Sequence, residues 1–275
     1  MRTGNRNLSL QSGKELRESH FMPRSLYALC RTDEYEPVKF RRGLLIPTSR
    51  QTKHPLFCSD CEQLLSREGE SWVLPLLRAL EGPFPPRDRL MKQAPVYQDA
   101  DKALYATAMN PEIDRPKLMH FAVGIFYKAA VHSWIASETK PHIDLSEGET
   151  DALRLYLLGQ ANLPKNMALC ITIDSSPIVL PAMIDPYWAK SPNFRWYVFY
   201  VPSLFAQLFL GEGVQETLAA NCINSNPLGP VLIEDVSKAM RNTMRCELNS
   251  ARKTKRLIET TDEIEKRGLS IRLGD

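Results

Sequence analysis

The sequence predicts an α+β protein in which helices precede a sheet of antiparallel strands. Residues 115–137 are apolar at nearly every turn and carry few charges, which is typical of a buried central helix. Three stretches rich in β-branched and aromatic residues then follow, bounded by Pro, Asp, Ser and Asn, and these predict strands: 167–174, 177–184 and 194–202. The sequence contains no phosphate-cradling glycine-rich loop, so nothing supports a nucleotide-binding fold.

The segments between these elements predict further structure. Residues 23–31 favour a short helix with Pro23 near its first turn, and "RRGLLIP" (41–47) favours a short strand. Residues 60–82 predict a helix that is broken at Gly69 and Pro75.

Two later segments also carry signals. Ser146 and Glu149 form a capping box, and Gly159 is a suitable C-cap, so a helix is expected over 147–158. Residues 203–210 either extend the sheet or start a helix.

A stiff, proline-rich connection, "GPFPPRD" (82–88), predicts a domain boundary. We expect a small N-terminal module over 1–82 and a larger α+β domain over 83–275. The second domain is expected to close with a basic amphipathic helix, or two, over 233–268. Its basic face is either a solvated surface or a surface that holds nucleic-acid backbone.

The charge is unevenly distributed along the chain. Residues 1–54 contain eleven Lys and Arg against five Asp and Glu, a net charge of +6, although the whole chain carries only +3. A basic N-terminus is compatible with a nucleic-acid partner and also with a merely solvated segment. No apolar run is long enough to cross a bilayer and no secretory signal is visible, so we expect a cytoplasmic protein without a membrane partner.

The cysteines point to one closely spaced pair. Of six cysteines, only Cys58 and Cys61 lie close together in the sequence, in "FCSDC", and in a cytosolic chain such a pair is more often a metal or redox site than part of a disulfide framework. A CxxC turn supplies two of the four ligands that zinc takes. A thioredoxin-like reading is weaker, because the alternation of strands and helices that it needs is absent.

Two stretches together, "SLQSGKELRESHFMP" (9–23) and "FCSDCEQLL" (57–65), resemble a group of uncharacterised bacterial proteins with the pattern CxxCG…ESHIIP…LCxxCEQ. That pattern is in turn similar to the HNH endonucleases, whose treble-clef, ββα-metal fold carries CxxC…DHIxP…LCxxCH. The resemblance is clearest over residues 8–70. It implies a treble-clef module at the N-terminus.

The resemblance also implies roles for particular residues. His20 matches the catalytic histidine, a general base for metal-assisted phosphodiester hydrolysis, with Mg²⁺ or another divalent cation stabilising the phosphate charge. Glu18 and Glu62 are the candidate oxygen ligands of that cation. Cys58 and Cys61 match the second zinc knuckle. The basic residues expected to contact nucleic acid, DNA in preference to RNA, are Arg17, Arg24, Arg41 and Arg42.

The sequence departs from the pattern at three places. Ser9 and Ser12 stand where the first knuckle has cysteines, so a four-thiolate zinc site cannot form, although Cys30 or His54 could substitute. Ser19 replaces the Asp or His that precedes the HNH base. Two functions are therefore open: an HNH-like nuclease or a nucleic-acid-binding descendant of one, and a catalytically inactive interaction protein that retains a degenerate zinc-finger-like fold, with a protein partner or a homodimer.

Overall fold

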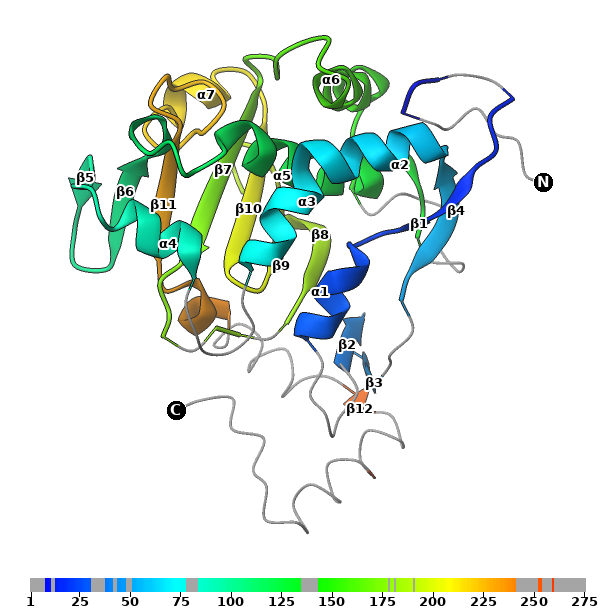
Figure 1. Ribbon diagram of the computed structural model, residues 1–275, viewed down its shortest axis with the longest axis horizontal. Coiled ribbons are helices and arrows are strands. Elements are labelled where there is room, and N and C mark those ends of the chain that lie inside the picture. The colour runs from blue at the N-terminus through cyan, green and yellow to red at the C-terminus, as the bar shows by residue number, and fades with distance from the viewer. Residues whose placement is uncertain are drawn as a thin grey trace.

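The structure is a computed structural model and is mixed helix and sheet, as the sequence predicts (Figure 1). It describes residues 8–10, 13–30, 38–41, 44–47, 51–77, 84–134, 143–177, 179–180, 182–189, 191–240, 252–253 and 259. No helix in these ranges is both long and apolar enough to cross a membrane.

A seven-stranded sheet forms the centre of the molecule. Its strands, in spatial order, are β5 (Tyr97–Gln98), β6 (Lys102–Ala106), β11 (Pro230–Glu234), β7 (Met167–Asp174), β10 (Leu204–Leu210), β9 (Arg195–Val201) and β8 (Ile184–Ala189). β10 extends the sheet, the first of the two alternatives for residues 203–210. Every neighbouring pair is antiparallel except β11 and β7, which are parallel, so the expectation of a purely antiparallel sheet is wrong at this pair.

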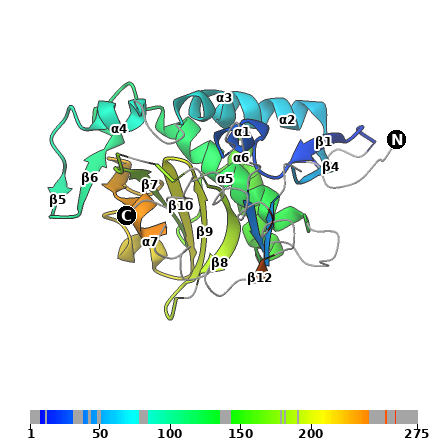
Figure 2. The same cartoon turned by 90° about the horizontal axis from the view of Figure 1, so that it is seen from below.

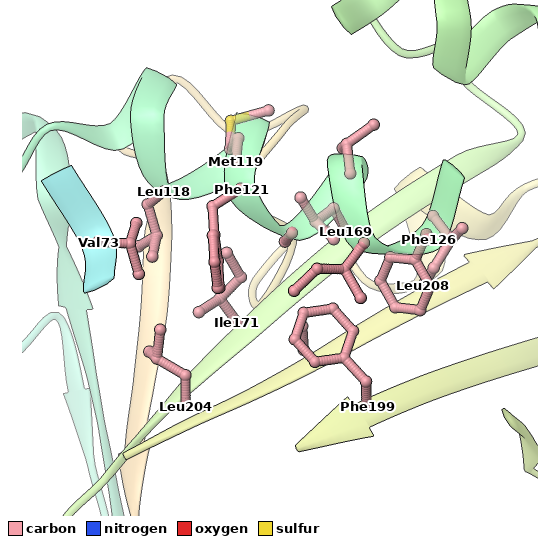
Figure 3. Close-up of a cluster of buried hydrophobic side chains, with 14 of the residues drawn as sticks. Val73, Leu118, Met119, Phe121, Phe126, Leu169, Ile171, Phe199, Leu204 and Leu208 are labelled. Carbon is pink, nitrogen blue, oxygen red and sulfur yellow. The ribbon is translucent and has the colours of Figure 1, made fainter. Parts of the chain in front are cut away.

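One long helix, α5 (Arg115–Val131), covers one face of this sheet, and it is the buried helix that the sequence predicts. Asp114 caps its first turn by accepting a hydrogen bond from the backbone N–H of Lys117 at 3.1 Å. Alternate residues of the central strands point at α5, because side chains in a strand alternate between faces. Figure 3 shows this core, in which the labelled residues from the strands are Leu169, Ile171, Phe199, Leu204 and Leu208.

A second helix, α6 (Glu147–Leu157), packs against α5 and confirms the predicted capping box. Ser146 accepts from the Glu149 backbone N–H at 3.3 Å, and the Glu149 carboxylate accepts from the Ser146 backbone N–H at 2.9 Å. Glu149 also pairs with Arg195 of β9, so the helix start is tied to the sheet.

A continuous helical segment over residues 59–76 lies along α5 (Figures 1 and 2), and its Val73 reaches the core beside Leu118 and Leu204 (Figure 3). It consists of α2 (Ser59–Leu65), the π-helical turn η1 (Ser66–Glu70), α3 (Ser71–Val73) and the 3₁₀ turn η2 (Leu74–Leu76). The predicted break at Gly69 is this π turn, and Pro75 falls in the 3₁₀ turn.

Gly69 allows the backbones to approach closely. A Cβ atom at Gly69 would lie 2.8 Å from the backbone nitrogen of Phe121, far inside van der Waals contact. The neighbouring residue Glu70 forms an ion pair with Lys128 of α5 at 3.1 Å, and the Lys128 side chain is only 3% exposed. The glycine turn and the buried ion pair therefore fix the segment on α5.

The opposite face of the sheet is covered by shorter segments. Around α7 (Val214–Thr217), Val214 and Cys222 pack on Ala168 and Cys170 of β7. A helical turn over 236–240 packs Val236 near the other end of the sheet, in a cluster with Leu180 and Tyr200.

The N-terminal strands lie in two small sheets, the second of which also contains a strand from the C-terminal part of the chain. β1 (Arg17–His20) pairs with β4 (Lys53–Phe57) in an antiparallel ribbon, and the predicted short helix, α1 (Arg24–Leu29), follows β1. The second sheet contains β2 (Val38–Arg41), β3 (Leu44–Pro47) and β12 (Arg252–Lys253), in which β12 lies parallel to β3.

Several predicted segments differ from the structure. The strand expected over 177–184 is wrong for the described residues before Ile184, which contain only an isolated bridge at Val179, and β8 begins at Ile184. The connection expected over 82–88 contains the start of a helix, α4 (Pro85–Leu90), since proline is favoured in a first helical turn. The tail helix cannot begin at 233, because Ile233 and Glu234 complete β11. Strands β5 and β6, and the 3₁₀ turn η3 (Thr107–Met109) after them, had no sequence signal.

The expected domain boundary and most of the basic tail lie outside the described residues, which omit 78–83, 241–251 and nearly all of 254–275. The division at 82–83 therefore stays a prediction. Within the described part of the chain, one hydrophobic cluster contains residues from both sides of that boundary, from Leu8 to Ile233.

The packing of the π turn gives a first testable prediction. Gly69→Ala is expected to lower the free energy of unfolding by about 1–3 kcal/mol, the usual cost of overpacking, because the added methyl group meets backbone atoms of α5 that cannot rotate away. Urea unfolding followed by circular dichroism measures the change.

The matched control is Gly148→Ala in the first turn of α6, where an added Cβ meets no atom within 4 Å. This variant should be neutral or stabilising, by up to about 1 kcal/mol, because alanine loses less backbone entropy in a helix. Equal effects of the two substitutions would contradict the close approach at Gly69.

Candidate functional site

The candidate site lies where the β1–β4 ribbon meets the start of α2. Along β1, Glu18 is exposed, Ser19 is 1% exposed and His20 is half-buried. This alternation points Ser19 inward, because neighbouring side chains in a strand face opposite sides. On the outer side, Glu18 forms an ion pair with Lys53 of β4 at 2.6 Å.

Ser19 connects the β1–β4 ribbon to α2 through hydrogen bonds. Its hydroxyl donates a hydrogen bond to Glu62 of α2 and accepts one from the backbone N–H of Phe57 at 3.2 Å. Glu62 is thus engaged by Ser19, whereas Glu18 is engaged by Lys53. The structure gives the two carboxylates separate partners and does not bring them together around His20.

His20 is half-buried near the end of the ribbon. Among the described residues, its ring makes no hydrogen bond, ion pair or ring contact. The backbone beyond it is fixed, because the N–H of Phe21 donates to the carbonyl of Thr52 at 3.0 Å. The imidazole is therefore held on an ordered strand while its nitrogens stay uncommitted within the described part of the chain.

An aromatic column joins the ribbon to the C-terminal end of α5. The rings of His54 and His132 stack with centroids 3.9 Å apart, and the His132 ring meets Trp134 edge-on at 5.3 Å. Trp134 in turn stacks on Phe21 at 4.8 Å. His54 therefore takes part in this packing, and it is not grouped with the thiols of Cys58 and Cys61.

Cys58 and Cys61 lie at the start of α2, with their sulfur atoms 3.3 Å apart. Both residues are 3% exposed, and burial raises the pKa of the Cys61 thiol. Ser9 lies beside this pair, close enough that its hydroxyl and backbone lower the pKa of Cys61 in opposition to burial. The Ser9 hydroxyl oxygen is itself buried.

Two residues that follow Ser9 in the sequence have left-handed backbone conformations, Leu10 with φ of 54° and Gly13 with φ of 80°. Ser9 lies beside Cys61, whereas Ser12 lies outside the described residues.

These residues do not fit a structural zinc ion. Zinc takes four nitrogen or sulfur ligands, and the described residues offer two thiols and one serine hydroxyl. Cys30 does not join them in a group of three candidate ligands among the described residues; it interacts with Tyr27 and Tyr200, and burial raises its pKa to about 12. No group of three or more His, Cys, Asp or Glu side chains suited to a metal is found within the described ranges.

The structure describes three of the four basic residues that were expected to contact nucleic acid. Arg17 and Arg24 are exposed, and neither pairs with a carboxylate of the described residues. Arg41 belongs to strand β2, and Arg42 lies outside the described residues. Close to the thiols, exposed Lys14 pairs with Asp60 at 3.2 Å, which raises the pKa of the lysine.

Two buried polar contacts had little signal in the sequence. His120 contacts the carbonyl of Leu157 through Nε2 at 3.1 Å, and burial lowers the pKa of its ring, in keeping with a structural histidine. Asp174 is fully buried and accepts from the backbone N–H groups of Ser176 and Ser237 at 3.0 and 3.2 Å. In the sequence, the contacts of Asp174 are indicated only by the position of this aspartate at the end of an apolar strand.

Ser19 provides the second testable prediction. Ser19→Ala removes the partner of Glu62 and of the Phe57 N–H, so the free energy of unfolding should fall by about 1–3 kcal/mol. The matched control is Ser66→Ala, since Ser66 is exposed in the π turn and should change stability by less than about 0.5 kcal/mol. A Ser19→Ala protein as stable as the control would show that this contact does not hold the ribbon.

The third prediction concerns metal. We expect purified protein to contain zinc well below one ion per chain, and dialysis against a chelator to leave its melting temperature unchanged, because the donor set is incomplete. Elemental analysis and a thermal melt measure both quantities. Stoichiometric zinc together with a chelator-induced fall in melting temperature would contradict the prediction.

Comparisons with known proteins do not assign this site. No protein-family model, no curated protein and no solved structure matches the chain.

Proposed function

We propose that this chain is a nucleic-acid-binding protein built on an HNH-like, treble-clef module that has lost its hydrolytic centre. The observation that carries the proposal is the separate engagement of the two candidate acids, Glu62 by Ser19 and Glu18 by Lys53. A cation that assists phosphodiester hydrolysis needs oxygen ligands gathered on one side of the base.

The treble-clef part of the proposal has three supports. Ser9 lies beside the CxxC pair, the pair stands at the start of a helix, and an antiparallel ribbon precedes that helix. The motifs "SLQSG", "ESHFMP" and "FCSDCEQ" occur in the order that the resemblance implies.

The nucleic-acid part rests on charge. The first 54 residues carry a net charge of +6, and Arg17 and Arg24 are exposed without a carboxylate partner in the described ranges. Such arginines are available to phosphate oxygens, which dominate the affinity of nucleic-acid-binding proteins. We propose DNA as the preferred ligand, following the resemblance to DNA-cutting enzymes.

Hydrolysis with His20 as general base is the second candidate function. It is favoured by the half-buried His20 ring, whose nitrogens have no partner among the described residues. A general base must be free to take a proton from water. In this case the divalent cation would be held by different ligands from Glu18 and Glu62, or these carboxylates would change partners.

The test measures binding and cleavage with the same protein. Fluorescence anisotropy with labelled duplex DNA, single-stranded DNA and RNA of equal length, over a range of salt concentrations, should give salt-sensitive binding that is strongest for DNA. The Arg17→Ala/Arg24→Ala variant should bind more weakly, and its slope of log K against log salt should fall by up to about 0.9 for each lost phosphate contact with duplex DNA.

Arg67→Ala is the matched control, because Arg67 is exposed but already paired with Glu68 at 2.6 Å. Its binding should equal that of the unchanged chain. No cleavage is expected with Mg²⁺, Mn²⁺ or Zn²⁺; cleavage that is lost in His20→Ala would instead establish the second candidate. Absence of binding to every nucleic acid would overturn the proposal and leave a protein partner or a homodimer as the open function.

A further inference from the structure

We infer that Cys58 and Cys61 are a redox modification site, at which a peroxide converts the two thiols into an intramolecular disulfide. Their sulfur atoms are 3.3 Å apart in the reduced chain, and both cysteines are free thiols. A disulfide needs a sulfur–sulfur distance of about 2.05 Å, so closure requires a movement of little more than 1 Å. This inference is independent of nucleic-acid binding.

The missing ligands make the pair available for oxidation. In a complete zinc site, four ligands share the metal, and the metal-bound sulfurs are committed to it. Here the polar group that the structure describes beside Cys61 is the buried Ser9 hydroxyl. Within the described part of the chain, the pair is therefore a dithiol without a complete metal site around it.

The pair also lies close to the surface. Both cysteines are buried, yet Asp60 between them in sequence has a side chain that is 74% exposed, and Lys14, paired with Asp60, is 47% exposed. The Lys14 ammonium is near enough to both sulfurs to interact with them, so the exposed pair of Lys14 and Asp60 borders the two thiols.

The reaction balances with peroxide as the oxidant. One thiolate attacks a peroxide oxygen, the O–O bond breaks, and a sulfenic acid and hydroxide form; the hydroxide takes a proton to become water. The second thiolate then attacks the sulfenic sulfur, the S–S bond forms, and the S–O oxygen leaves as a second water. Two thiols lose two electrons and two protons in total, and the peroxide is reduced to two waters.

A second cysteine pair in the protein provides the control. Cys170 and Cys222 pack in one cluster under α7, and burial raises the pKa of Cys170 strongly. The Cys222 thiol is engaged by Asn224, to which it donates at 2.7 Å. This pair is expected to stay reduced under conditions that oxidise Cys58 and Cys61.

The experiment uses the full chain, reduced and then freed of reductant. After brief exposure to hydrogen peroxide at a small molar excess, the protein is denatured and alkylated, and its intact mass is measured. The six cysteines should give six adducts before oxidation and four after it, and proteolytic fragments should contain a Cys58–Cys61 disulfide.

Two variants sharpen the result. Cys58→Ser should abolish the loss of two adducts, whereas Cys170→Ser should keep it, with five adducts falling to three. A thermal melt confirms that each variant is folded, and the fragment map of the unchanged chain tests the inference even if a variant does not fold. Six adducts after oxidation, a disulfide between other cysteines, or thiols protected by stoichiometric zinc would each overturn it.

Discussion

The contact between the Gly69 turn and the backbone of α5 determines how the N-terminal part of the chain sits on the sheet. α5 packs on the sheet and also contacts residues 59–76, which lie along it. The absence of a side chain at Gly69 and the buried pair of Glu70 with Lys128 fix that segment along and across the helix. Breaking such a pair by removing one partner leaves a buried charge, which is strongly unfavourable. The orientation of α2, and with it that of Cys58 and Cys61, follows from this contact.

The ribbon is attached to α2 by the Ser19–Glu62 hydrogen bond, without a complete set of zinc ligands among the described residues to reinforce it. A structural zinc ion contributes about 10–16 kcal/mol in small zinc-finger peptides, whereas a buried hydrogen bond contributes only about 1 kcal/mol. A very small domain could not accept this exchange. Here the ribbon shares its hydrophobic cluster with α5 and the sheet, through residues such as Phe21 and Phe57, so the larger core stabilises it.

The elements that the sequence predicts well are those with local signals. α5 has a continuous apolar stretch, α6 has its capping box, and β7 is a run of β-branched and apolar residues. The parallel position of β11 has no local signal, because it depends on pairing with β7 across about sixty residues of chain. In the site, the motif assigns Ser9 and the CxxC pair to one module, and this assignment stays a prediction. It could not foretell that Ser19 would take Glu62, because that contact depends on which face of β1 turns inward.

The position of β11 has a consequence for the order in which the protein is built during synthesis. β11 lies between β6 and β7. The strands on its two sides, β5 and β6 on one and β7 to β10 on the other, are translated before it and have no direct hydrogen bonds to each other. The first part, β5 and β6, must wait until residue 234 has been translated before it can join the rest. Until then both facing strand edges are unpaired, and an unpaired edge is a template for pairing with another chain. Nascent chains are therefore most exposed to misassembly just before the last central strand emerges.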